Sequence, residues 1–186
     1  MKTYIKKDFP VDKVRRFLEP GPIVLVSSAY KDETNIMAMG WHMVMEFEPS
    51  RLGCFITAAN HSYELIRKSR EMVINIPTVD MINTVIDIGN CHGGKGEDKF
   101  GKFGLTPVDA DNVSAPLIKE CYASFECRVV DTGLLRKYSM FVLEVVKAHV
   151  ATSPKYPATM HYRGDGVFML SGKNVSYKSR FKQQNL

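Results

Sequence analysis

The sequence predicts a mainly β protein: an antiparallel β-barrel with a few short helices. Segments rich in β-branched and aromatic residues follow one another with polar turns between them. Most are joined directly, without the regular strand–helix–strand alternation of a doubly wound sheet. The 186 residues, 45% hydrophobic and 24% charged, fit one domain with a substantial core. We therefore treat residues 1–186 as a single domain.

The first third of the chain predicts three strands in succession. A segment with helical spacing comes first and ends at the breaker "EPGP". A β-branched strand follows, and the polar turn "KDET" makes it the first arm of a hairpin. The turn "EPSRLG" then leads to a third strand. The expected elements are a helix at 11–18 and strands at 22–30, 35–45 and 54–59.

The rest of the chain alternates less regularly. We expect Asn60 or Ser62 to cap the first full helix, because both types favour helix N-termini. The segment 89–104 is too rich in glycine for regular structure. The expected elements are helices at 61–69 and 79–89, and strands at 71–77, 115–133, 138–152 and 166–171.

One stretch, "NIMAMGWHMVM" (35–45), is unusual. It holds the only tryptophan and four of the ten methionines, and it carries no formal charge. Alternation along a strand would gather its large side chains on one face. These are Met37, Met39, Trp41, Met43 and Met45. Such a face is either core or a surface for a flat ligand, with Met43 and Met45 the better candidates for core.

Composition and charge exclude several classes of protein. The net charge is +5, but the last sixteen residues hold four Lys/Arg and no acid, so the body is almost neutral. No basic stripe interleaved with aromatics, as single-stranded nucleic acid requires, is present. No uncharged run approaches a bilayer span, and the N-terminus lacks the apolar core of a signal peptide. We expect a cytoplasmic protein that binds neither nucleic acid nor membrane and takes a small anionic ligand.

Metal and nucleophile motifs are missing from the sequence. The four cysteines form no CxxC pair, and the five histidines form no HExxH or other metal pattern, so no metal is expected. Cys91, beside His92, is the only cysteine whose surroundings suggest reactivity. Gly89, Gly94 and Lys95 match the start of a P-loop, but Gly96 replaces the magnesium-binding Ser or Thr. If the chain does chemistry, a cofactor is expected to supply it.

Two places could hold an anion. His61 and Ser62 fall at the start of a helix, where free N–H groups and the helix dipole favour a phosphate; alternatively they are a cap and a surface residue. Lys99 and Lys102 lie in the glycine-rich loop, where they either reach a phosphate or are solvated. Spacing alone leaves both alternatives open.

Five motifs occur in an order that is specific in combination. They are "PGPIVLVSS", "TNIMAMGWHMV", "NHSYELIRKSREMVINIPT", "DKFGKFGLTP" and "APLIKECYASFECRVVD". This succession, from about residue 20 to 170, resembles the flavin reductase-like FMN-binding proteins, particularly the flavoredoxin type. The resemblance implies a split β-barrel that dimerises and binds FMN non-covalently near the subunit interface. It does not extend to the basic tail, residues 171–186.

The resemblance also implies roles for particular residues. The strand from Asn35 to His42 would lie along the flavin ring, with Asn35 at its polar edge. His61 and Ser62 would approach the phosphate, and Lys99 would neutralise it. Asn60 departs from the arginine or similar residue expected in many relatives. The implied cofactor-binding residues are Asn35, Met37, Met39, Trp41, His42, His61, Ser62 and Lys99, with Ser27, Ser28 and Asn75 as weaker assignments.

The implied function is that of an FMN-binding oxidoreductase. One form is an NAD(P)H-dependent flavin reductase, in which the nicotinamide cofactor is a transient donor. The alternative is a flavoredoxin-like electron carrier that exchanges electrons with a redox protein partner. We expect a homodimer in either case and assign no catalytic acid or base.

Overall fold

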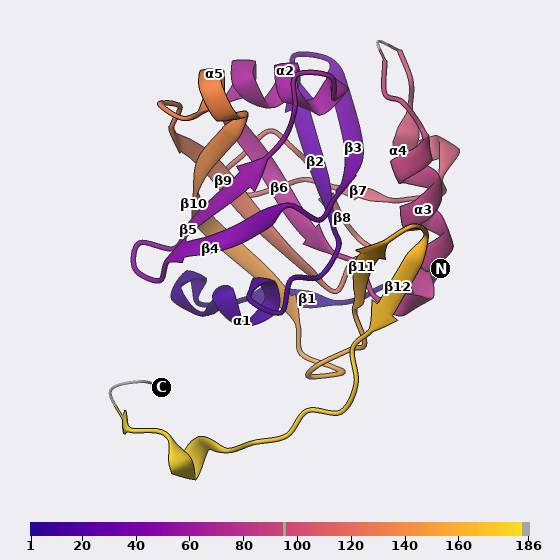
Figure 1. The fold of residues 1–186 in the computed structure, drawn as a ribbon. Coiled ribbons are helices and arrows are strands. Elements are labelled where there is room, and N and C mark those ends of the chain that lie inside the picture. The colour runs from indigo at the N-terminus through magenta and orange to yellow at the C-terminus, as the bar shows by residue number, and fades with distance from the viewer. Residues whose placement is uncertain (95, 184–186) are drawn as a thin grey trace.

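The computed structural model describes residues 1–94 and 96–183, which are built around one antiparallel sheet (Figure 1). Seven strands follow the order β3-β2-β6-β9-β10-β5-β4, and β1 pairs with β10. Their bounds are β1 Lys6–Asp8, β2 Val24–Tyr30, β3 Glu33–Met39, β4 His42–Glu46, β5 Arg51–Phe55, β6 Glu71–Ile76, β9 Ala123–Asp131 and β10 Met140–Ala151. Every pairing is antiparallel, as predicted.

The helices are short and lie around the sheet (Figure 1). The two longest helices, α2 and α3, were both predicted. The bounds of α2 agree with the prediction, whereas α3 ends one residue later than predicted and is preceded by a 3₁₀ turn where the helix was expected to start. The short α4 was missed: Asp98 caps it by accepting a hydrogen bond from Gly101 N (3.0 Å). The α-helices are α1 Arg15–Leu18, α2 His61–Ser69, α3 Ile82–Asn90, α4 Lys99–Lys102 and α5 Leu135–Tyr138, and the 3₁₀ turns are Val11–Lys13, Val79–Met81 and Lys178–Arg180.

The expected strand 35–45 is instead two strands, so that prediction was wrong. The break falls at Gly40 and Trp41, and β3 and β4 then pair at opposite ends of the sheet. A Cβ on Gly40 would lie 2.9 Å from Cδ1 of Ile23, so a side chain there would require Ile23 to move. The break ends the alternation: Met39 is 4% exposed, whereas Trp41 is 70% exposed. Met43 and Met45 are also exposed and are not core.

Other differences lie at the ends of elements. The strand expected at 54–59 is β5, which begins at Arg51, because Leu52 and Cys54 already alternate inward there. The two long segments at 115–133 and 138–152 contain β9 and β10 as expected. The strands not yet placed are β7 Pro107–Val108, β8 Leu117–Ile118, β11 Met160–Gly164 and β12 Val167–Leu170. Three short strands, β1, β7 and β11, were missed, whereas β8 lies within the expected segment 115–133 and β12 is the strand expected at 166–171.

The two larger of three apolar clusters among the described residues position the rest of the molecule. The larger fills the curved sheet and includes Phe125, Phe141 and Tyr122. The smaller lies outside β2 and β3, where Leu25 and Ile36 meet residues of α3 and α4. This second core holds α3 and the loop after it against the face of β3.

The ends of the described chain differ in packing. The N-terminal strand β1 is paired into the sheet. Residues 171–183 extend away from the body and form only a 3₁₀ turn (Figure 1). Among the described residues, no helix is long and apolar enough to cross a membrane.

Candidate functional site

A pocket of about 130 Å³ lies between β3, the start of α2 and the segment after α3. We name it the Lys99 pocket. Its lining is Asn35, Met37, Ala38, Asn60, His61, Ser62, Ile88, Gly89, Asn90, Cys91, His92, Gly93 and Lys99. Five of the predicted site residues are therefore brought together from separate parts of the sequence.

Ser62 is the centre of a buried polar group in this pocket. Its hydroxyl accepts hydrogen bonds from Nδ2 of Asn35 (2.8 Å) and from Oγ of Ser28 (3.2 Å). Ser62 and Ser28 are fully buried, and Asn35 is 4% exposed. These bonds tie β2, β3 and α2 together, so the position of Asn35 is fixed before any ligand binds.

The first turn of α2 has no side-chain cap. Asn60 is the N-cap residue, but its Nδ2 donates to Oγ1 of Thr57 (3.1 Å) and its side chain accepts nothing from the helix. Asn60 thus occupies the N-cap position as predicted, but neither it nor Ser62, whose hydroxyl is occupied elsewhere, caps the helix through its side chain. Uncapped N–H groups and the positive end of the dipole make this helix start suitable for an anion.

Lys99 brings a positive charge into the pocket. It is only 3% exposed, and its Nζ donates to the carbonyl oxygens of Ile36 (3.0 Å) and Cys91 (2.6 Å). No ion pair of Lys99 exists among the residues that the structure describes. Burial lowers its pKa below the usual value. An ammonium has three N–H donors, so Lys99 retains one donor and an uncompensated charge for an anionic ligand.

Lys102 is arranged differently, which separates the two lysines that the sequence could not distinguish. Its side chain is exposed, and its Nζ lies 2.5 Å from Oε1 of Glu97 and 3.3 Å from Sγ of Cys91. Lys102 does not line the pocket. Its charge is therefore already paired on the surface.

His61 has a partner that the sequence did not indicate. Its Nε2 lies 2.7 Å from Oε1 of Glu33, at the start of β3. This pair joins α2 to β3 beside the pocket, whose lining includes His61 but not Glu33. A ligand would meet the other ring nitrogen of His61, or would have to displace Glu33.

The segment that follows α3 packs closely against the side chain of Asn35. A Cβ on Gly93 would stand 2.6 Å from Oδ1 of Asn35, a distance that no side chain can adopt without a shift. Sequence reasoning identified this stretch only as a glycine-rich loop. The need for glycine at this position appears only once β3 is in place.

A second pocket of about 210 Å³ continues along β3, and we name it the Trp41 pocket. It is lined by Met37, Ala38, Met39, Gly40, Trp41, Phe55, Thr57 and Asn60, and three of these residues also line the Lys99 pocket. The rings of Trp41 and Phe55 lie 5.1 Å apart. A polar pocket and one lined by Trp41, Phe55 and two methionines thus share a wall.

Four predicted site residues, Ser27, Ser28, His42 and Asn75, line neither pocket. Nε2 of His42 is 2.8 Å from the carbonyl oxygen of Pro22, and burial lowers the pKa of His42. Asn75 accepts hydrogen bonds from Ile118 N (3.0 Å) and Ser124 Oγ (2.7 Å), and donates to Ser27 Oγ (3.1 Å). Asn75 therefore joins β2, β8 and β9 inside the barrel. A role of any of the four toward a ligand stays a prediction.

The family is settled by comparison with known sequences. The model of the family described as "Flavin reductase like domain" matches residues 15–169. The chain belongs to this family. The flavin reductase-like chain is 36% identical over 131 residues to an uncharacterized protein of Pyrococcus abyssi, covering 70% of this chain and 74% of that one. It is 33% identical over 175 residues to the uncharacterized protein YddH of Escherichia coli, covering 87% and 92%.

Solved structures confirm the fold of this flavin reductase-like chain. An FMN-binding domain of a flavin reductases-like enzyme from Shewanella baltica superposes with a TM-score of 0.86 at 22% identity, covering 95% of this chain and 99% of that one. A flavoredoxin of Desulfovibrio vulgaris gives a TM-score of 0.75 at 22% identity, covering 85% and 90%. A protein with a split barrel domain, from Shewanella frigidimarina, gives a TM-score of 0.72 at 17% identity, covering 89% of each chain. At these identities the likeness concerns the fold, and it supports the predicted split barrel.

Proposed function

We propose that this chain is an oxidoreductase that binds FMN non-covalently across the Lys99 and Trp41 pockets. The observation that carries the proposal is the buried, unpaired ammonium of Lys99 next to the uncapped start of α2. Support comes from the family and from neighbours whose descriptions name FMN or flavoredoxin.

The donors fit a phosphate. Lys99, the first-turn N–H groups of α2 and the ring of His61 surround one small polar pocket. Charge-assisted hydrogen bonds of this kind contribute roughly 1.5–3 kcal/mol each. Glu33 opposes a phosphate from beside the pocket, because its carboxylate lies against His61. The net balance favours an anion, since Lys99 is the more deeply buried charge.

The walls fit a flat ring. Ligand pockets usually enclose about 300–1,000 Å³, so neither pocket alone is large enough. Together they form one path along β3, polar at the Lys99 end and lined by Met37, Met39 and Trp41 at the other. Asn35, fixed by Ser62, offers an amide between the two ends.

The bound group would supply the electron chemistry, since flavins exchange reducing equivalents without help from a side-chain acid or base. The chain's own residues bind and orient. Lys99 holds the anionic end, Asn35 and the backbone of β3 hold the polar edge, and Trp41 and Met39 keep water from one face. No residue of this chain is assigned a proton transfer.

We also propose that the chain acts as a homodimer. Trp41, Met43 and Met45 expose large apolar side chains on and next to β4, at 70%, 50% and 44%. Gly53 of β5 lies beneath the side chains of Met43, Met45 and Met140, so this face continues across β5 to β10. An exposed apolar face of this kind typically marks an interface. Since it adjoins the Trp41 pocket, a partner subunit would help to close that pocket.

Titration with FMN and with riboflavin, which lacks the phosphate, tests the binding proposal. Calorimetry on the flavin-free protein should show tighter binding of FMN than of riboflavin. A preparation that carries no visible flavin absorbance and cannot be reconstituted by FMN would overturn the proposal.

Anaerobic mixing with NADH or NADPH separates the two forms of the function. Rapid bleaching of the flavin absorbance identifies an NAD(P)H-dependent reductase. A flavin that stays oxidised with both donors, but is reduced by a chemical reductant, identifies an electron carrier with a protein partner. We favour the reductase, because the family is described as flavin reductase-like.

A further inference from the structure

The C-terminal tail leaves the body and does not return to it (Figure 1). It starts at Ser171, whose N–H donates to the carbonyl oxygen of Thr159 (2.9 Å) and whose Oγ accepts from Thr159 N (2.8 Å). From 172 to 183 every residue is exposed. Within this described part of the tail, the hydrogen bonds join tail residues only to one another, as in the bond from Arg180 N to the carbonyl oxygen of Tyr177 (2.9 Å).

The tail exposes large apolar side chains, which a segment that makes no contacts would not require. Val175 is 75% exposed, and Tyr177 and Phe181 are each 58% exposed. The basic residues among them are Lys173, Lys178, Arg180 and Lys182, and the tail has no acidic residue. Disordered or solvating tails are poor in aromatics, whereas segments that order on binding keep aromatic anchors between charges. The tail therefore has the composition of a docking segment.

A groove with the matching chemistry lies between α1 and β4. It encloses about 360 Å³ and is lined by Leu18, Glu19, Gly21, His42, Met43, Val44, Met45, Glu46 and Phe47. We name it the Met45 groove. Methionine side chains adapt to the shape of an aromatic partner and contact its ring favourably. The groove suits tyrosine and phenylalanine anchors.

The polar groups of the groove also match the tail. Glu46 has no ion-pair partner among the described residues, and its Oε1 accepts only from Phe47 N (2.7 Å). Glu19 pairs with Arg15 at 3.2 Å on the surface. An occupant that brings cations would compensate Glu46, which has no ion-pair partner within the described part of the chain.

We propose that the tail of one copy of this chain docks into the Met45 groove of a second copy. The root of the tail lies beside α1: Gly172 and Asn174 share a pocket with Arg16 and Phe17. Beyond Asn174 the described tail is exposed throughout and none of its residues lines the groove, although the groove is on the same helix. Met43 and Met45 belong both to the groove and to the apolar face of the homodimer proposed above, on which this inference rests. The tail would extend that interface.

Sedimentation at several protein concentrations tests whether the tail stabilises the dimer. A chain that ends at Gly172, and the double variant Tyr177→Ser/Phe181→Ser, should each raise the dimer dissociation constant at least tenfold. Tyr162→Ser is the matched control, because Tyr162 is 52% exposed and lines neither the groove nor the pocket at the root of the tail. Circular dichroism checks that each variant is folded, as expected because residues 173–183 are exposed.

Photo-crosslinking identifies the surface that the tail contacts. A benzophenone amino acid at position 181, in a mixture of ¹⁴N- and ¹⁵N-labelled protein, should join the tail to the peptide containing Met43 and Met45 in products of mixed isotope content. Products of a single isotope content would show that the tail folds onto its own groove, and crosslinks to other surfaces would show another site; both overturn the proposal.

The same experiments separate this inference from the homodimer itself. If the truncated and wild-type chains dimerise equally, docking of the tail is wrong and the β4 face alone makes the dimer. If the full chain is monomeric at every concentration, both dimer proposals are wrong, while FMN binding is still decided by the titrations.

Discussion

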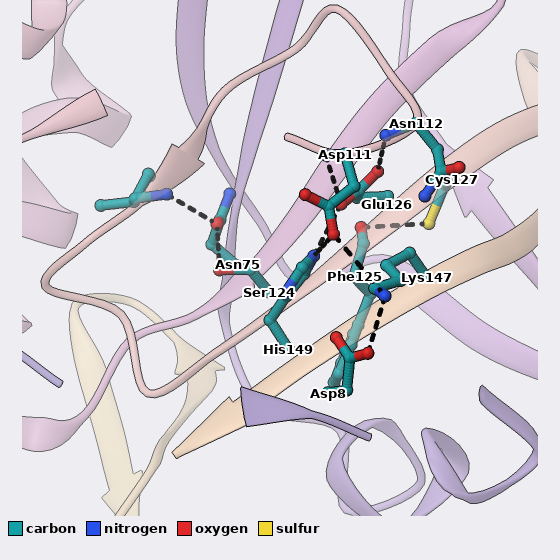
Figure 2. Close-up of polar contacts among 11 residues, drawn as sticks. Asp8, Asn75, Asp111, Asn112, Ser124, Phe125, Glu126, Cys127, Lys147 and His149 are labelled. Atoms are coloured by element: carbon teal, nitrogen blue, oxygen red, sulfur yellow. Dashed lines mark hydrogen bonds and ion pairs between the residues drawn. The ribbon is translucent and has the colours of Figure 1, made fainter. Parts of the chain in front are cut away.

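Nε2 of His149 lies 2.6 Å from Oε1 of Glu126, a carboxylate with no solvent exposure (Figure 2). The same carboxylate accepts hydrogen bonds from the backbone N–H groups of Asp111 (3.0 Å) and Asn112 (2.6 Å). Glu126 thus anchors the loop before β8 to β9 and β10. Buried charges persist only when they are paired in this way.

Lys147 adds a positive charge next to this cluster of polar residues. Asp8, Asp111 and His149 bring ligand atoms within 4.8 Å of one another, an arrangement that could suit a metal ion. Nζ of Lys147 stands 2.9 Å from Asp8 and 3.6 Å from Asp111 (Figure 2). The ammonium already compensates both carboxylates, so a metal would have to displace it. The sequence-based expectation of no metal stays a prediction.

Acid should destabilise the protein through Glu126. Burial would raise its pKa, but the bonds from His149 and from the two amides lower it below the usual value. Because the pKa is lower in the folded state, the ionised carboxylate stabilises the fold fully above about pH 4.5. This stabilisation is lost as the pH falls through the folded-state pKa. Glu126→Gln should cost about 1–3 kcal/mol at neutral pH and flatten the dependence of unfolding free energy on pH below 4.5.

Urea unfolding at a series of pH values measures this effect. Glu71→Gln is a control for the same loop. Glu71 lies on β6, and its Oε2 accepts a hydrogen bond from Ser114 N of the loop (2.8 Å) at an exposed site. A Glu126→Gln protein as stable as the wild type at neutral pH would contradict the prediction.

Lys99→Ala should weaken FMN much more than riboflavin. Loss of one charge-assisted bond of roughly 1.5–3 kcal/mol corresponds to a roughly 10- to 150-fold weaker affinity. Lys102→Ala should change FMN affinity little, because Lys102 is exposed and paired with Glu97. Calorimetric titration of the three proteins with both ligands measures the difference. Equal losses for FMN and riboflavin would remove Lys99 from the phosphate site.

The pH dependence of FMN affinity should also report Lys99. Its lowered pKa means that the ammonium loses its proton at a lower pH than an ordinary lysine. Because an anion binds the charged form, affinity should fall as pH rises through this pKa, and bound FMN should shift it upward. Measurements above about pH 7 avoid the second ionisation of the phosphate, near 6. A profile identical in wild type and Lys99→Ala would exclude Lys99 as the titrating group.

Alkylation should modify one thiol in the folded protein. Cys91 is half-buried in the Lys99 pocket, whereas Cys54, Cys121 and Cys127 are fully buried. Burial raises the pKa of Cys54 and Cys121 to about 12, so their thiolates are scarce. Iodoacetamide followed by mass spectrometry should locate the label on Cys91, and FMN should slow the reaction while riboflavin slows it less. Labelling at a rate independent of FMN would show that the ligand does not reach this end of the pocket.

Local patterns in the sequence predicted much of the fold. The β-branched runs that form β2, β6, β9 and β10 are continuous and bounded by turn residues, so their period is clear. The break at Gly40 was not predictable, because residues 35–45 carry an unbroken alternation and only the position of β5 forces β4 to the other end of the sheet. Short strands such as β7 and β11 depend on a partner rather than on their own residues.

The site divides in a similar way. Motif order placed Asn35, Ser62 and Lys99 together, and the structure gathers them in one pocket. Local sequence could not show that Lys99 is buried while Lys102 is exposed, because that depends on which face of α4 meets β3. Glu33 has no sequence signal at all, because its role comes from a contact with His61 across 28 positions.

The junction at Gly40 and Trp41 has a mechanical consequence. The two end strands of the sheet, β3 and β4, are neighbours in sequence but not hydrogen-bonded partners among the described residues. The barrel is therefore closed along this seam by a covalent link rather than by a ladder of hydrogen bonds. A seam of this kind can widen without breaking any backbone pairing, and the shared wall of both pockets runs along it. We therefore expect any change in the width of the ligand path to occur at this seam, since the other strands of the sheet are joined by backbone hydrogen bonds.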